Sequence, residues 1–469
     1  MLIPSLTSSS LFLPSTQRIE HSRVWSAHTN IGVLAFEREA LSEAAVQGAG
    51  AAYDGIITHS TWNLEVLRRH TMLRPLAVLG MEGFDGETFY PHRRDSMCGG
   101  IFNGDGEHGS GNGGGDVRAI ETATAAAAAA TAAAATEAAE VGERAGERGG
   151  AVATPTAAAT GPLIIFSGGK FEYRKGQDLV VDAFKRFHRQ HPDSLLRFAW
   201  HNMWPNTALT MNASALVRRY GMPVRMATGR YDFTSWLLSV GLPHGSFEDL
   251  GVVPSEEMPQ VLMASHAALF MNRGEGCTNL LAKEALATGL VAVLSANTGH
   301  LDLIRSLASD EKCVVGEDVR VGGGRVESEG GRVAARAVQE GTGARMATTA
   351  VRRRRCVPLP EPLDATIATI ATAGKTLGTT GVTATTDSSV PPLPLFLLKE
   401  QTPTPGRPGW HESSPVEAVA ALEAIYHDRA GACARGLRAA ARMRERWTWD
   451  DVLLPWAERI VSWASLPGG

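Results

Sequence analysis

Short apolar runs alternate with amphipathic segments in two parts of the chain. In the first part, residues 24–48 begin irregularly and then follow a helical period. Two apolar runs, Tyr53–His59 and Leu76–Leu79, then predict strands on either side of a helix that begins at Ser60, because serine is a favoured N-cap residue. The pattern predicts a β-α-β unit that is too short to be a complete nucleotide-binding domain.

Between residues 163 and 295 the alternation is more regular, with apolar strands and one-faced helices. The predicted strands are Leu163–Ser167, Leu196–Trp200, Leu250–Val253, Ala268–Met271 and Leu290–Ser295. The predicted helices are Gln177–His188, Trp236–Val240, Ser255–Ser265 with Ser255 as its cap, and Leu280–Thr288. Continuously apolar strands that alternate with helices predict an α/β fold with a doubly wound parallel sheet. A further helical stretch is predicted from Pro415 to Trp463.

Two low-complexity tracts interrupt this pattern. Residues 96–160 are rich in Gly and Ala, and residues 317–405 are rich in Arg, Gly, Thr and Pro. Both tracts are too poor in large apolar residues to form a core, so we interpret them as insertions. The rest, roughly 300 residues, divides into a partial N-terminal domain at 1–95, a C-terminal domain at 161–316 and closing helices within 406–469.

The bulk composition excludes several classes of protein. With 45 basic and 49 acidic residues, the net charge of -4 does not indicate a nucleic-acid partner. No run approaches the ~20 apolar residues that span a bilayer, although contact with a membrane surface stays open. The five cysteines form no CxxC pair, and the sequence predicts no metal site. The Arg-rich run at 351–356 is interpreted as a solvated charge cluster rather than a nucleic-acid patch.

The start of the chain carries little information on location. Its first 18 residues are rich in Ser and Thr and contain no acidic residue, which loosely suits a transit peptide. An unstructured terminus is the favoured interpretation. The sequence leaves cytoplasmic and organellar locations open.

The segment Asn272–Ser295 carries the clearest chemical signal. It joins a predicted strand to a predicted helix through the turn Gly274–Asn279, whose free backbone amides and positive helix-dipole end suit a phosphate. In a doubly wound sheet, ligands bind outside the carboxyl ends of strands, where this turn must lie. Glu275 in the turn and Glu284 in the helix can then border one pocket. Taken alone, this segment is better explained as an ordinary strand–helix connection with surface carboxylates.

A basic segment, Gly168–Gly176, follows the first strand of the same predicted sheet. Lys170 and Lys175 flank a turn at the corresponding edge, and two cations beside a helix N-terminus can neutralise a diphosphate. A solvated basic turn is the alternative for this segment alone. The two segments together are more specific than either one.

Both segments resemble signatures of the retaining glycosyltransferases of family 4, which have the GT-B fold. Lys170-x4-Lys175-Gly176 resembles their GRxxxxKG segment. Glu275-Gly276 with Glu284 and the following Ala-Leu-Ala-Thr-Gly resembles their EGFGxxxxEAMACG signature. The resemblance implies two Rossmann-like domains of similar size, with the active site between them.

A bacterial-type branch of that family is more similar still. It reads EGGTNLVAMEAMACG and then LSANTGHLDLI, and Leu294–Ile304 repeats the second string letter for letter. The resemblance extends to YDGIITHSTWN at 53–63, GFD before Phe89 and WHE at 410–412. It covers roughly residues 24–95, 161–316 and 406–465 and neither low-complexity tract.

The resemblance implies a role for each matching residue. Glu275 would be the catalytic carboxylate that hydrogen-bonds the transferred sugar, and Glu284 would hold the ribose hydroxyls of the nucleotide. The donor diphosphate would be bound by Lys170, Lys175, Gly276, Thr278, Asn279 and Leu280. The implied reaction is transfer of a sugar from a nucleotide diphosphate sugar, with retention, to an acceptor that the sequence does not identify. It needs no cofactor or obligatory metal, in agreement with the absence of any Asp-x-Asp pair.

Polar residues after two other strands are candidates for lining the same cleft, with structural turns as the alternative. They are His201, Asn202, Asn297, Thr298 and His300. Among histidines of the N-terminal part, His28, His59 and His70 belong to no motif, and a surface position is favoured for each.

Several departures from the family pattern bear on activity. The two glutamates are spaced E-x8-E, Cys277 stands where the family has glycine, and Lys170 stands where it has arginine. The N-terminal half is short and has no Gly-rich phosphate loop, so we expect a truncated N-terminal domain. Two alternatives therefore stay open: an inactive nucleotide- or glycan-binding remnant, and another GT-B chemistry such as a phosphorylase or a sugar-phosphate synthase.

Overall fold

The computed structural model describes seven stretches of the chain: 31–37, 39–78, 82–91, 161–308, 314–315, 354–355 and 393–453. The first 18 residues, His28, the insertion at 96–160, most of 317–405 and the predicted helix beyond residue 453 lie outside them. Two compact units are present, one formed by Met1–Ala308 with Asp387–Gly469 and the other by Ser309–Thr386. In the second unit, β11 (Val314–Val315) and β12 (Arg354–Arg355) pair antiparallel.

The centre of the larger unit is a six-stranded sheet in which every neighbouring pair is parallel. Its strands are, in spatial order, β13 (Phe396–Leu398), β10 (Val291–Ser295), β9 (Ala267–Phe270), β4 (Leu163–Gly168), β5 (Ser194–Ala199) and β8 (Phe247–Asp249). This confirms the predicted α/β class and the doubly wound parallel sheet.

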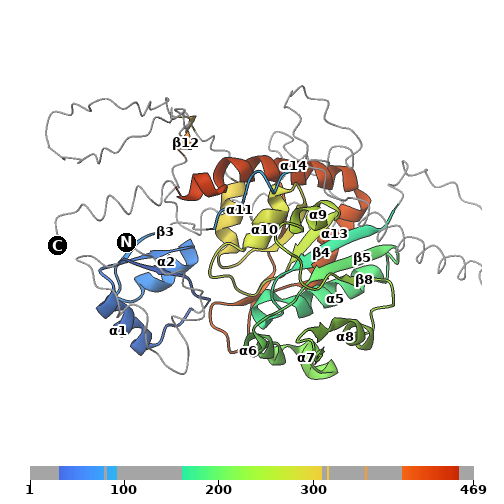
Figure 1. The fold of residues 1–469 in the computed structure, drawn as a ribbon, viewed down its shortest axis with the longest axis horizontal. Coiled ribbons are helices and arrows are strands. Elements are labelled where there is room, and N and C mark those ends of the chain that lie inside the picture. The colour runs from blue at the N-terminus through green and yellow to red at the C-terminus, as the bar shows by residue number, and fades with distance from the viewer. Residues whose placement is uncertain are drawn as a thin grey trace, which may run out of the picture. The chain divides into compact units, whose positions relative to one another are not determined.

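Helices cover both faces of this sheet, because its central strands are apolar on both sides (Figure 1). Ile165 of β4 faces one core and Phe166 the other, as the alternation of a strand requires. On the first face lie α5 (Gln177–His188), α7 (Ala215–Tyr220), α8 (Phe233–Val240) and α13 (Pro415–His427). On the second lie α9 (Met258–Met263), α10 (Leu280–Ala287), α11 (His300–Ala308) and α14 (Arg429–Arg446).

The winding of the sheet reverses between β4 and β9. From β4 the chain proceeds outward to β5 and β8, and it then returns to β9 on the other side of β4 before moving to β10 and β13. The carboxyl ends of β4 and β9 therefore flank a topological switch point, the place where doubly wound sheets bind their ligands. The segments after these two strands are the two that the sequence singled out.

A smaller sheet is formed by β1 (Ile31–Leu34), β2 (Gly55–Thr58) and β3 (Pro75–Val78), again all parallel. It carries α1 (Glu43–Ala52) and α2 (Thr61–Arg68). The predicted cap of α2 is confirmed, because the Ser60 hydroxyl accepts a hydrogen bond from the Asn63 amide. The remaining short elements are α6 (Pro205–Ala208), the 3₁₀ helices η1 (Tyr173–Lys175) and η2 (Leu209–Ala213), and the antiparallel pairs β6 (Val224–Arg225) with β7 (Tyr231–Asp232) and β14 (Gln401–Pro403) with β15 (His411–Ser413).

Several predictions differ from the structure. Residues 24–48, predicted to become helical after an irregular start, form strand β1 at Ile31–Leu34, and helix α1 begins only at Glu43. Ser255 does not cap a helix: α9 begins three residues later, after Glu257, with Pro259 in its first turn, where a missing amide costs nothing. The strand predicted at Leu250–Val253 is the segment just after β8. The tract at 317–405, interpreted as an insertion, contains described strands, among them β13, which pairs with β10 of the central sheet, and β14, which pairs with β15. None of the helices formed by the described residues is both long and apolar enough to cross a membrane.

Candidate functional site

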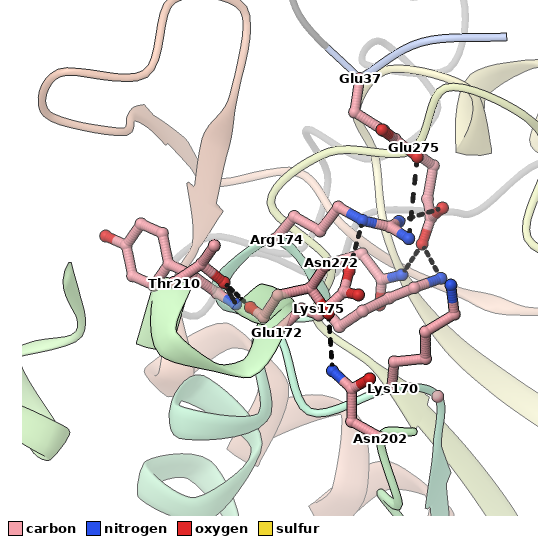
Figure 2. A network of polar contacts seen from close by, with 12 residues as sticks. Glu37, Lys170, Glu172, Arg174, Lys175, Asn202, Thr210, Asn272 and Glu275 are labelled. Carbon is pink, nitrogen blue, oxygen red and sulfur yellow. Dashed lines mark hydrogen bonds and ion pairs between the residues drawn. The ribbon is translucent and has the colours of Figure 1, made fainter. Parts of the chain in front are cut away.

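Polar side chains from three loops meet at the switch point (Figure 2). The loops follow the carboxyl ends of β4, β9 and β10, and they supply Arg174, Lys175, Glu275 and Thr298. Because the carboxyl ends of parallel strands lie at the same edge of the sheet, side chains that are about a hundred residues apart in the sequence are in direct contact.

Glu275 is the centre of this network. Its carboxylate accepts hydrogen bonds from Lys175 Nζ at 2.5 Å, from Arg174 Nη1 at 3.0 Å and from the side-chain amide of Asn272. Burial opposes its ionisation most strongly, but Lys175 and Arg174 outweigh burial and lower the pKa of Glu275 to about 2. Glu275 is therefore a fixed negative charge at any physiological pH.

Arg174 belongs to the same network, although the sequence predicted no role for this residue of the basic segment. Besides Glu275, its guanidinium contacts Glu172 at 2.9 Å and Glu37 at 3.7 Å. Glu37 follows the carboxyl end of β1, so the smaller sheet contributes to the same network. The alternation of basic and acidic residues at 170–175 is the feature of the sequence that could have indicated this ion-pair network.

Lys170 has a different environment from Lys175. Its amino group lies 4.4 Å from the centre of the Trp204 ring, a cation–π contact, and the residue is exposed. Although the residue as a whole is exposed, partial burial of its amino group lowers its pKa; Arg174 and Lys175 act in the same direction and Glu172 opposes them. In Figure 2 its amino group points toward the same side as that of Lys175. Lys170 is thus the cation of this segment that is not bound to Glu275.

The N-terminal end of α10 faces this network with unused backbone amides. Among the described residues, no group accepts a hydrogen bond from the amides of Asn279 or Leu280, as expected at a helix start. The Thr278 amide and hydroxyl instead donate to one carboxylate oxygen of Glu82, at 3.3 Å and 3.2 Å. A carboxylate already lies where the sequence predicts a phosphate. No pattern in the sequence distinguished Glu82.

Two residues at the site have an uncommon backbone conformation. In the described part of the chain, Asn279 (φ 65°) and Thr298 (φ 42°) are the non-glycine residues with positive φ. Asn279 precedes α10, and the Thr298 hydroxyl accepts a hydrogen bond from the Glu275 amide at 2.8 Å. Such conformations cost energy and concentrate at ligand sites.

The glycines of the turn allow backbones to approach closely. A Cβ on Gly276 would lie 2.3 Å from the carbonyl oxygen of Phe36, and one on Gly299 would lie 1.8 Å from that of Cys277. The Gly276 carbonyl also accepts a hydrogen bond from the Ser60 hydroxyl at 2.7 Å. Gly276 is thus fixed against segments that follow β1 and β2, whatever its amide binds.

Glu284 has no protein partner for its carboxylate among the described residues. It is half-buried in α10, and burial alone raises its pKa to about 7. A half-buried carboxylate without a partner is costly to fold and is a common sign of a functional group.

The residues predicted to line the cleft are mostly bound within the protein. Asn202 donates to Phe171 O and accepts from the Trp204 amide, and Asn297 donates to Asn272 O at 2.9 Å. His300 is fully buried between Ser295 O and the Asn279 side chain, and burial lowers its pKa to about 4. His201 is half-buried, and burial lowers its pKa as well. These side chains hold the loops in place, and their contact with a ligand stays a prediction.

A second group of buried residues lies beside the start of α10. Lys283 is fully buried, donates to the Glu82 carbonyl and lies 4.1 Å from the centre of the Trp447 ring. Burial lowers its pKa to about 8, against the attraction of Glu82. Burial also raises the pKa of the Cys277 thiol, so this cysteine is not an activated nucleophile.

Comparisons with known proteins give distant structural matches. The chain matches no known protein family and no curated protein. Similar solved structures include a sucrose-phosphate synthase from Thermosynechococcus elongatus, with 12% identity over 95% of this chain and 71% of that one and a TM-score of 0.47. Another is HepE from Anabaena in complex with UDP and glucose, with 10% identity over 92% and 71% and a TM-score of 0.45. These scores are too low to support a function, which we therefore base on the site.

Proposed function

We propose that this protein is a glycosyltransferase whose nucleotide diphosphate sugar binds at the carboxyl ends of β4 and β9. The observation that carries the proposal is the start of α10, where the amides of Asn279 and Leu280 have no acceptor among the described residues and the adjacent Thr278 amide already binds the Glu82 carboxylate. An anion is bound there within the chain itself, so the site has the chemistry that a diphosphate needs. Calorimetric titration with UDP and GDP tests the proposal.

In this proposal each part of the site has one task. The amides after Gly276 and the side chains of Lys170 and Lys175 bind the diphosphate, and Glu284 accepts hydrogen bonds from the ribose hydroxyls. Glu275 contacts the transferred sugar and, with its fixed charge, orients Lys175 toward the leaving phosphate. Electrostatic stabilisation of the departing diphosphate supplies the rate enhancement.

The domain division is part of the same proposal. Residues 1–95 form the acceptor side, 161–316 form the donor side and the helices within 406–469 complete the fold. The contacts of Glu37 and Ser60 with the donor-side loops support this arrangement.

One observation favours a second candidate, a nucleotide-binding protein without catalysis. Lys175 and Arg174 are both occupied by Glu275, so the strongest positive charges of the site are already neutralised. Hydrolysis or transfer of a bound nucleotide sugar distinguishes the enzyme from this binding protein.

The pKa of Glu284 predicts a pH dependence of nucleotide affinity. If the ionised carboxylate binds the ribose, affinity should rise with pH, because the ionised fraction goes from about one tenth at pH 6 to about nine tenths at pH 8. UDP affinity should increase by about ninefold over this interval beyond the change in Glu284→Gln, which controls for ionisation of the phosphate. Equal pH profiles for the two proteins would contradict the assigned role.

The raised pKa of Glu284 also predicts how the stability of the protein depends on pH. Because folding raises the pKa of Glu284 from its ordinary value of 4.5 to about 7, the folded state holds the proton more tightly between about pH 4.5 and 7. The contribution of this group to the free energy of unfolding should fall as the pH rises through that window and should be absent in Glu284→Gln.

Glu82→Gln should strengthen nucleotide binding. The substitution removes a negative charge from the amide that the diphosphate is proposed to use, and a charge at this distance changes affinity by about 2- to 10-fold at low salt. Glu87→Gln, which alters an exposed glutamate of the same segment, should leave affinity unchanged. Weaker binding by Glu82→Gln, measured by calorimetry, would show that the carboxylate and the ligand do not compete.

A further inference from the structure

Two imidazoles and a carboxylate converge at the edge of the sheet opposite to the switch point. His191 lies in the turn between α5 and the amino end of β5, and Glu423 and His427 lie one turn apart at the end of α13. One potential ligand atom from each of the three lies within 4.8 Å of the others.

The distances are close to those of a metal-binding set. The Nε2 atom of His191 lies 2.7 Å from Oε2 of Glu423, and Nε2 of His427 lies 3.4 Å from the same oxygen. Ligand atoms about 2.0–2.2 Å from a tetrahedral zinc ion lie about 3.3 Å from one another. His427 already has this spacing to Glu423, whereas His191 lies closer to Glu423 than two ligands of one zinc ion do and would move slightly outward when the ion binds.

The protein orients one of the ligand side chains, His191, before any ion binds. The ring of His191 packs against Phe187 and Tyr426, at centroid distances of 4.6 Å and 3.9 Å. Tyr426 is in turn fixed by hydrogen bonds from its hydroxyl to both carboxylate oxygens of Asp193, at 3.1 Å. This support is what orients the ligands of a metal site.

An independent observation is that one polar atom of the cluster has no hydrogen-bond partner. The second carboxylate oxygen of Glu423, Oε1, is buried and has no hydrogen-bond partner among the described residues. A buried, unsatisfied carboxylate oxygen is costly, and a hydrogen bond between His191 and Oε2 leaves it unexplained. A cation bound by both carboxylate oxygens of Glu423 would remove that cost.

We propose that His191, Glu423 and His427 bind a zinc ion. Two imidazole nitrogens and one carboxylate oxygen are ligands that zinc prefers, whereas magnesium and calcium prefer oxygen ligands alone. The exposed side chain of His427 leaves a fourth position open to water. The ion joins the turn after α5 to the end of α13, so it ties the closing helices to the first face of the sheet. This site is separate from the proposed donor site and does not depend on it.

The test uses the full chain after treatment with a chelator. Titration with Co²⁺, followed by visible absorption, should show one tightly bound ion that zinc displaces, and Mg²⁺ should not displace it. His427→Ala removes an exposed ligand without disturbing the core, and it should lower the affinity for Co²⁺ and for zinc by at least about 10-fold. His244→Ala, which removes an exposed histidine elsewhere, should leave affinity unchanged.

A second readout is thermal stability. Zinc should raise the melting temperature of the wild-type chain and of His244→Ala, and it should raise that of His427→Ala less, because a ligand of the folded state stabilises that state. The proposal is overturned if no ion binds, if His427→Ala binds as tightly as the wild type, or if His244→Ala and His427→Ala lose affinity equally.

Discussion

Replacing Arg273 with alanine is expected to lower the free energy of unfolding by about 3–5 kcal/mol. The guanidinium is buried and binds both carboxylate oxygens of Asp178, at 2.7 Å and 2.8 Å, and one of Glu412, at 2.7 Å. It also lies 3.9 Å from the centre of the Tyr173 ring and donates to the Tyr173 carbonyl. Without it, the Asp178 carboxylate is left charged and unpaired in the interior. Urea unfolding of the two proteins measures the loss.

An exposed ion pair on the same helix as Asp178 serves as the control. Arg186 contacts Asp182 at 3.0 Å, with side chains 45% and 40% exposed, so Arg186→Ala should cost less than about 1 kcal/mol. Arg273→Lys keeps the charge but cannot bind both carboxylate oxygens of Asp178 as the guanidinium does. Its loss in free energy of unfolding should therefore lie between those of Arg273→Ala and Arg186→Ala. A similar loss for Arg273→Ala and Arg186→Ala would show that Arg273 does not anchor the loops behind the site.

Glu275→Gln is expected to lower transfer or hydrolysis of the nucleotide sugar by at least about 100-fold. The substitution keeps the shape of the side chain but removes the fixed charge that Lys175 and Arg174 surround. Affinity for the nucleotide diphosphate should be unchanged or higher, since Lys175 is released from its partner. Turnover and calorimetric affinity, measured on the same preparation, separate the two effects.

The matched control for this variant is Glu172→Gln. Glu172 is also buried and its carboxylate also binds Arg174, at 2.9 Å, but the amino group of Lys175 is bound by Glu275 and not by the Glu172 carboxylate. It should lower stability by an amount similar to Glu275→Gln and retain most of the activity. Equal losses of activity would mean that the network acts only as a scaffold, and retained activity in Glu275→Gln would remove its catalytic assignment.

The sequence predicted the central sheet well, because β4, β9 and β10 are apolar on both faces and can be recognised without tertiary information. It missed β13, which is short and follows a proline-rich run that predicts extended chain. A three-residue edge strand becomes visible only once β10 is available to pair with it.

The site was predicted less completely than the fold. The sequence predicted roles for Glu275 and Lys175 in two separate segments. In the structure the two side chains form a hydrogen bond, because their loops follow the parallel strands β9 and β4, whose carboxyl ends lie at the same edge of the sheet. Glu82 and Arg273 carry no local signal: each acquires a role through partners that are far away in the sequence. The cluster of His191 with Glu423 was missed for the same reason, since more than two hundred residues separate its members.

Calorimetry is the sharpest test of whether the start of α10 binds a nucleotide diphosphate, as proposed. UDP or GDP should bind with one site per chain, and the corresponding nucleoside should bind at least about 10-fold more weakly, because it lacks the charge-assisted hydrogen bonds of the diphosphate. Glu284→Ala should weaken binding more than Cys277→Ala. No binding of either nucleotide, equal affinities for nucleotide and nucleoside, or equal affinities for the two variants would contradict the claim.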